Sequence, residues 1–364
     1  MANANKYGLI NLLDLGLLDP DQTVGQADSE LLSSAIDFDT AAHNAAINSL
    51  KRIFFEDFTD FQLEVASQTS ARNQPLDPNG RALPIKPVAP YTISLPLLGS
   101  GNAWGANFLA MRLMSNRVLA QTIQTMMRGD LQWVLDHILA ALFANADWTS
   151  RDLFGHGDLT IHGLANSDAV TYYSTLTGGV ATDSHYLAQA AAIADATNPF
   201  PSIYTELKEH PDNQGDVVAF ISSSQVAGAT GLAEFNSATL DQDILLGANT
   251  DRLVGALDAN FMPPYSTLKG KTDSGVWIVE WPVLPSGYMI ALTTLGRRPL
   301  GRRLIPDASL QGFAARGDRA DWPWSETQWN RWEGYGALNR VGAVVQRTSN
   351  GAYAVPTNYA EPMP

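Results

Sequence analysis

Six histidines are the residues of this sequence best suited to acid–base or metal chemistry, because the chain contains no cysteine. Only two of them, His156 and His162, lie close together, and Asp152 and Asp158 flank them. Two histidines separated by a glycine-containing turn are more often independent surface residues than metal ligands. We therefore expect no metal site, and the absence of cysteine excludes disulfides, thiolate metal sites and cysteine nucleophiles.

A glycine-rich stretch, Gly99–Gly105, precedes a predicted helix and invites comparison with a dinucleotide-binding loop. That motif requires glycine where Trp104 stands, and the extended segment before it is interrupted by prolines. The sequence also contains no P-loop, HExxH pair, G-x-S-x-G turn or EF-hand loop. We therefore expect no catalytic residue and no cofactor, and we interpret Gly99, Gly101 and Gly105 as a hinge.

Charge is unevenly distributed along the chain, whose net charge is −14. Residues 1–60 carry ten acidic and three basic side chains, whereas residues 281–350 carry nine arginines and five acidic side chains. The arginines could contact nucleic acid, form solvated faces or bind an acidic neighbouring chain. We favour the neighbouring chain, with a subunit interface formed by Arg297, Arg298, Arg302, Arg303, Asp14, Asp37 and Asp39.

The first half of the chain is predicted to contain several extended segments and two helices. An extended arm over residues 1–26 precedes a helix from about Asp39 to Phe55. Residues 61–98, with many prolines, are expected to form a long two-stranded arm that needs a surface to lie on. A long helix over 107–143 follows, with Gly129 as its weak point. Its charged side chains exclude a membrane span, and we expect no membrane partner.

The second half alternates short strands with short helices. Val217–Ile221 is a continuous apolar run that predicts a buried central strand. The other predicted elements are strands at 158–162 and 169–173, helices at 184–196 and 202–210, a strand pair at 277–281 and 288–292, and a hairpin of strands 342–346 and 352–356.

This order of elements resembles the major capsid protein family of tailed bacteriophages, which has the Hong Kong 97-type fold. Three segments carry the resemblance: Trp329–Val345, with its Arg and Gly-rich aromatic turn before Asn-Arg, then Asp216–Ser223 and Glu280–Tyr288. The resemblance implies an α+β fold with an N-terminal arm, an extended β-hairpin loop, a long spine helix, a peripheral domain and an axial domain.

The resemblance implies that the chain is divided into five segments, and two of these segments together form the peripheral domain. They are the arm and first helix (1–60), the extended loop (61–105), the spine helix and first part of the peripheral domain (106–179), the axial domain (180–311), and the return to the peripheral domain with the C-terminal tail (312–364).

The resemblance also implies a non-enzymatic structural protein. It would self-assemble into homo-pentamers and homo-hexamers of an icosahedral shell, assembled in the host cytoplasm and present in the virion. Packaged double-stranded DNA would be contacted only weakly and non-specifically, which suits an acidic chain. A separate scaffolding protein, a portal and a decoration protein are further partners that the family allows. Two alternatives stay open: an encapsulin-like bacterial nanocompartment shell, and a soluble hydrolase or ligand-binding protein.

Overall fold

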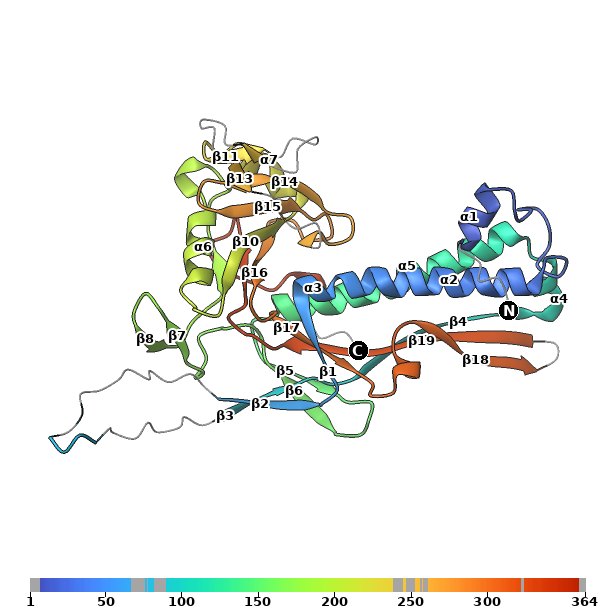
Figure 1. Cartoon of the computed structure of the whole chain (residues 1–364), viewed down its shortest axis with the longest axis horizontal. Helices are drawn as coiled ribbons and strands as arrows, with labels where there is room; N and C mark the ends of the chain where they lie inside the picture. The colour runs from blue at the N-terminus through green and yellow to red at the C-terminus, as the bar shows by residue number, and fades with distance from the viewer. Residues whose placement is uncertain are drawn as a thin grey trace.

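The computed structural model describes residues 7–66, 76, 78–81, 90–237, 245–246, 253–255, 257, 261–321 and 324–359. The chain is α+β, as predicted, and has two parts (Figure 1). An elongated body consists of two long helices lying along a sheet, and an upper domain with its own sheet stands at one end of this body.

Two long helices, α2 (Ser29–Ser49) and α5 (Asn116–Phe143), lie side by side and run in the same direction along the body (Figure 1). The α2 helix begins well before the predicted start at Asp39, because the Asp28 carboxylate accepts hydrogen bonds from the N–H groups of Glu30 and Leu31. The short α3 (Lys51–Phe54) follows it. The predicted extended N-terminal arm instead contains the helix α1 (Leu9–Asp14), which packs on α2 and α5.

The predicted helix over 107–143 is two helices, α4 (Phe108–Leu113) and α5. The break falls at Met114, whose backbone is extended and whose carbonyl accepts a hydrogen bond from the Val24 N–H. Ser115 then caps α5 by accepting from the Val118 N–H. Gly129, the predicted weak point, lies inside an uninterrupted helix. Tertiary pairing and a serine cap, not a glycine, therefore decide where the helix begins.

The sheet of the body is organised around its longest strand, β19 (Trp324–Ala337). It is antiparallel to β4 (Leu98–Asn107), β17 (Leu300–Leu304) and β18 (Ala314–Asp321). The strand β1 (Phe55–Phe58) completes this sheet by pairing in parallel with β17.

The hinge predicted at Gly99, Gly101 and Gly105 is wrong, because all three glycines lie within β4. Gly99 is opposite Trp332 and Gly105 is opposite Glu326 in a continuous ladder. Glycine here provides space: a Cβ on Gly99 would lie 3.0 Å from the Trp332 indole. Ladder hydrogen bonds on β19 hold this segment in the sheet.

The predicted two-stranded arm is present at its base. The strand β2 (Gln62–Ala66) is antiparallel to β3 (Pro90–Ser94), with Gln62 opposite Ser94. The two strands leave the body at its lower left (Figure 1). Most of the arm beyond them, including residues 67–75 and 82–89, lies outside the described residues. Two further small hairpins lie near this end of the body, β5 (Trp148–Arg151) with β6 (Asp158–Ile161), and β7 (Tyr172–Ser174) with β8 (Gly179–Ala181).

The upper domain contains a sheet of seven strands in the order β11-β14-β15-β10-β16-β20-β9. The predicted buried strand is confirmed as β10 (Gln214–Ile221), whose last five residues are buried. The other strands are β9 (Tyr186–Ala188), β11 (Phe235–Ser237), β14 (Thr267–Thr272), β15 (Val276–Glu280), β16 (Tyr288–Leu295) and β20 (Ala343–Arg347). The helices α6 (Phe200–Lys208) and α7 (Val226–Thr230) and the strands β12 (Leu245–Leu246) and β13 (Leu253–Gly255) accompany this sheet.

Three expectations for this domain are wrong. The strands β15 and β16 do not pair with each other, because β10 lies between them. Residues 184–196 form no α-helix, since β9 pairs in parallel with β20. Residues 352–356 do not pair with β20, whose edges are taken by β16 and β9. In each case a partner distant in the sequence replaced a local one.

A single hydrophobic core joins the body to the upper domain. Phe54 at the end of α3 stacks on Trp281, with ring centroids 5.5 Å apart, and also contacts Phe220 of β10. The buried half of α5, including Val134 and Ile138, belongs to the same cluster. The two parts of the chain are therefore joined by packed apolar side chains as well as by the polypeptide.

Substitution of two glycines, Gly334 and Gly129, tests how closely the elements of the body are packed. A Cβ on Gly334 of β19 would collide with the backbone carbonyl oxygen of Pro96, whereas the nearest atom to a Cβ on Gly129 would be Asn102 Nδ2 at 3.5 Å. We expect Gly334→Ala to lower the free energy of unfolding by about 1–3 kcal/mol. Gly129→Ala should raise it by about 0.5–1 kcal/mol, because alanine favours the helix. Urea unfolding measures both, and a neutral Gly334→Ala would contradict this close approach.

Candidate functional site

Two of the arginines predicted at a subunit interface are buried inside the chain, so that prediction is wrong for them. Arg302 Nε lies 2.7 Å from Asp57 Oδ1, and Arg303 Nη1 lies 2.7 Å from Asp152 Oδ1. The Arg302 and Arg303 residues are only 3% and 4% exposed. The physical reason is the pairing of β1 with β17, which places Asp57 opposite Arg302 in the register.

Arg297 and Arg298 also find partners within the chain. Arg298 Nη1 donates to the carbonyl oxygens of Thr293 and Thr294, and its guanidinium lies over the ring of Phe261. Arg297 Nη2 lies 3.5 Å from Glu56 Oε2, and its side chain is 58% exposed. The attraction between the acidic first segment and the basic later stretch therefore acts within one molecule. An intermolecular role for the exposed Arg297 stays a prediction.

Of the acidic residues predicted at the interface, one forms a hydrogen bond within the chain and two are exposed. Asp39 Oδ2 accepts a hydrogen bond from the Leu9 N–H at 2.9 Å, and burial raises the pKa of its carboxyl above the ordinary value. This carboxylate therefore holds α1 onto α2. Asp14 and Asp37 are exposed, so their role at an interface stays a prediction.

The strongest electrostatic feature of the body is a buried network around Arg331 of β19. Its guanidinium contacts Asp130 of α5 at 2.8 Å, Glu333 at 2.7 Å and the Asn44 side chain of α2 at 2.9 Å. His43 Nε2 lies 2.8 Å from the second oxygen of Asp130. Burial by itself would lower the pKa of Arg331, but Glu333 and Asp130 raise it above its ordinary value. The residue therefore stays charged in the interior.

The network borders a polar cavity of about 380 Å³ between α2, β17 and β19. Arg302 extends the network, because its Nη1 lies 3.7 Å from Glu333 Oε2. The Tyr335 hydroxyl donates to the same carboxylate at 2.6 Å. Sequence reasoning missed this network. The available signal was the charged pair Arg331 and Glu333 between the aromatic residues Trp329, Trp332 and Tyr335.

A second buried ionic cluster lies at the base of the two-stranded arm. Asp152 accepts hydrogen bonds from the Leu97 N–H, Arg303 and His156 at 2.7, 2.7 and 2.6 Å. Burial opposes ionisation, but these donors lower the pKa of the Asp152 carboxyl below its ordinary value. The ring of Phe61, at the start of the arm, stacks on His156 with centroids 4.1 Å apart.

The two histidines that are close in sequence do not share a site. His156 contacts Asp152, while His162 Nε2 lies 3.1 Å from the carbonyl oxygen of Thr92 in β3. Both histidines therefore contact the base of the arm, His156 at Phe61 and His162 at Thr92.

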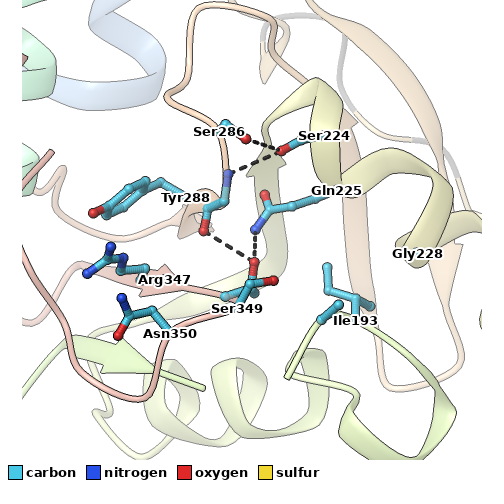
Figure 2. A pocket seen from close by; sticks show the side chains of 12 residues that line it. Ile193, Ser224, Gln225, Gly228, Ser286, Tyr288, Arg347, Ser349 and Asn350 are labelled. Carbon is cyan, nitrogen blue, oxygen red and sulfur yellow. Dashed lines mark hydrogen bonds between the residues drawn. The ribbon is translucent and has the colours of Figure 1, made fainter. Parts of the chain in front are cut away.

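A polar cavity of about 320 Å³ opens in the upper domain beside the end of β20 (Figure 2). Ser224 Oγ accepts hydrogen bonds from the Gly287 N–H and from the Ser286 hydroxyl, and Gln225 Nε2 donates to Thr348. Its lining residues include neither histidine nor a carboxylate that could activate a serine. These bonds instead connect the loop after β10, the turn before β16 and the end of β20.

Within the described part of the chain, no helix combines the length and the apolar character needed to cross a membrane.

Comparisons with known proteins identify the fold. No protein-family model and no curated sequence matches the chain. A solved structure from Mycobacterium phage Patience is similar over 95% of each chain, with a TM-score of 0.67 and 18% identity. The capsid structure of the cyanophage P-SCSP1u is similar over 82% of this chain and 87% of its own, with a TM-score of 0.51 and 10% identity. The chain therefore has the Hong Kong 97-type fold of tailed-phage major capsid proteins.

The Arg331 network yields a prediction on stability. Arg331→Met would leave Asp130 and Glu333 buried without their cation, and we expect the free energy of unfolding to fall by about 3–5 kcal/mol. Arg297→Ala removes an exposed ion pair and should cost less than about 1 kcal/mol. Chemical denaturation of the two variants measures the contrast. Equal losses would show that the buried network does not organise the body.

The Asp152 cluster yields a prediction on pH. Because folding lowers the pKa of this carboxyl, its stabilisation is complete above the ordinary value of 3.8 and is lost as pH falls through the lower folded value. The difference in unfolding free energy between wild type and Asp152→Asn should therefore be large at neutral pH and shrink on acidification below about pH 4. The exposed neighbour Asp158→Asn serves as the control. A pH-independent difference for Asp152→Asn would contradict the assignment.

Proposed function

We propose that this chain is a major capsid protein that assembles with copies of itself into the icosahedral shell of a tailed phage. The observation that carries the proposal is the fold match along 95% of the chain to a phage structure. A likeness of this extent includes the long helices, the body sheet and the upper domain together.

The two-stranded arm supports an assembly role. Its base is held in place by the buried Asp152–Arg303 pair and by the Phe61–His156 stack. The strands β2 and β3 pair with each other and lead away from the body (Figure 1). A two-stranded ribbon is marginally stable by itself in water. A neighbouring copy would cover the arm and so contribute the buried area that an obligate assembly requires.

Exposed apolar side chains mark a second contact surface at the opposite end of the body. Phe108, Leu109 and Leu113 of α4 are 38%, 59% and 71% exposed. Such a group on a short helix is costly for an isolated molecule and favourable at an interface. The exposed Asp14, Asp37 and Arg297 stay charged candidates for contacts between copies, with Arg297 beside β1 and therefore away from α4.

The charge distribution supports the packaging of double-stranded DNA with weak, non-specific contacts. The chain carries a net charge of −14, and the Arg302, Arg303, Arg331 and Arg340 side chains are buried. Sequence-independent binding to phosphates depends on accessible lysine and arginine. A shell wall of this composition would therefore allow DNA to move during filling.

The finer features of the proposal follow the fold family. The shell would contain homo-pentamers and homo-hexamers, form in the host cytoplasm and become part of the virion. Residues 61–97 would form the extended loop, the upper domain with β20 the axial domain, and the body with β4, β17, β18 and β19 the spine and peripheral domain. These bounds differ from the predicted 61–105, 180–311 and 312–364, because β4 and β17 pair with β19 and β20 pairs with β16. A scaffolding protein, a portal and a decoration protein would be its further partners.

Electron microscopy of the purified protein tests the proposal. We expect closed shells from the wild-type chain and folded, unassembled subunits from the double variant Leu109→Glu/Leu113→Glu. These side chains are exposed, so their replacement should change subunit stability by no more than about 0.5 kcal/mol each. The exposed Leu295→Glu in the upper domain is a control for added charge alone.

The outcomes separate the alternatives. Particles from the natural source should contain double-stranded DNA, whereas enclosed enzymes would favour a nanocompartment. A wild-type chain that stays monomeric at high concentration would overturn the proposal and favour a soluble enzyme or binding protein.

A further inference from the structure

A cluster of two histidines and carboxylates lies where the upper domain meets the small hairpins of the body. His185 precedes β9, His210 follows the end of α6, and Asp183 lies in the connection between β8 and β9. His185 Nε2 lies 3.1 Å from His210 Nε2, and these atoms lie 3.2 Å and 2.9 Å from Asp183 Oδ2. Both histidines are buried, and they are 25 residues apart in the sequence.

The hydrogen bond made by Nδ1 of each imidazole ring shows that the lone pair of the neutral ring is on Nε2. His185 Nδ1 lies 2.8 Å from the carbonyl oxygen of Ala343, and His210 Nδ1 lies 3.0 Å from that of Tyr173. A carbonyl oxygen can only accept, so each Nδ1 donates its proton. In the neutral rings each Nε2 therefore presents a lone pair, and both lone pairs are directed toward the same carboxylate oxygen. Three acceptor atoms this close require a cation among them.

We propose that this cluster binds a divalent transition-metal ion of the zinc type through His185 Nε2, His210 Nε2 and Asp183 Oδ2. Two imidazole nitrogens with one carboxylate oxygen are a ligand set that suits zinc, whereas calcium and magnesium prefer oxygen alone. Tetrahedral ligands at zinc distances are about 3.3 Å apart. The observed separations of 3.1, 3.2 and 2.9 Å are close to such a triangle.

The surroundings already contain the outer contacts that metal-binding histidines require. Both Nδ1 atoms donate to backbone carbonyls, which orients the rings. The other oxygen of Asp183 accepts from the Ser184 N–H, which leaves Oδ2 for the ion. Glu209 Oε1 lies 3.5 Å from His210 Nε2, and its other oxygen accepts from Ser174. Asp183 also forms a group of neighbouring carboxylates with Glu206 and Glu209, so Glu209 is the nearest side chain to which a fourth ligand position can be assigned.

The ion would connect four segments that come from three separate parts of the sequence, near residues 173–185, 210 and 343. The ligands come from the β8–β9 connection and the end of α6, while the carbonyl acceptors belong to β20 and to β7. The site would therefore fasten the base of the upper domain to the hairpin β7–β8. It is a property of one folded chain, so it does not depend on the proposed shell.

Metal binding by the full-length chain tests this inference. After chelator treatment and dialysis, we expect the wild-type protein to take up one zinc ion per chain, measured by mass spectrometry of the metal. Cobalt(II) bound in its place should show the visible absorption bands of a tetrahedral site. Zinc should also raise the melting temperature of the wild-type protein.

Variants and a matched control locate the site. Asp183→Asn and His210→Gln should each weaken zinc binding at least tenfold and abolish the zinc-dependent rise in melting temperature. His162→Gln changes a histidine outside the cluster and should leave both unchanged. Unaltered binding in Asp183→Asn and His210→Gln would overturn the inference. So would a wild-type chain that takes up no zinc and shows no cobalt bands, since a proton would then be the shared cation. The wild-type measurements decide this even if a variant does not fold.

Discussion

The body of this protein depends on one buried positive charge, the guanidinium of Arg331. A charge in the interior must be matched by hydrogen-bonded partners, because leaving it unpaired costs several kcal/mol. Here the partners come from different elements: Asp130 from α5, Asn44 from α2 and Glu333 from β19 itself. The two long helices and the sheet consequently cannot shift relative to one another without breaking this set. Apolar packing holds them together, and the ionic network determines their alignment.

A second arrangement follows from two adjacent arginines on one strand. Side chains of neighbouring residues in a strand point to opposite faces of the sheet. Arg302 therefore reaches Asp57 and Asn48 on the side of α2, while Arg303 reaches Asp152 and the carbonyl of Leu95 at the base of the arm. The single strand β17 thereby links the helical face of the body to the arm.

The use of arginine inside the subunit has a consequence for the proposed shell. Arg302, Arg303 and Arg331 are buried and paired with carboxylates inside the subunit, so they do not contribute to a positive surface. In the proposed shell, contacts between copies would therefore come from apolar groups such as those on α4 and from the arm.

Several features could be predicted from the sequence because their cause is local. The apolar run Val217–Ile221 predicted the central strand β10, and the proline-rich segment predicted an arm. The sequence also showed two oppositely charged segments, although not that their partners lie within one chain. Composition and short-range pattern determine such features, because they depend on neighbouring residues only.

Other features were decided by tertiary structure alone. The sequence of Gly99–Gly105 predicts a flexible loop. In the structure this segment is a strand, because β19, more than 200 residues later, provides its hydrogen-bonding partners. The pairing of β9 with β20 replaced a predicted helix, and the break before α5 arose from contact with the N-terminal segment. His185 and His210 meet only because β9 pairs with β20 and α6 packs against the same sheet. Burial and partners distant in the sequence determine these outcomes, and no local pattern encodes them.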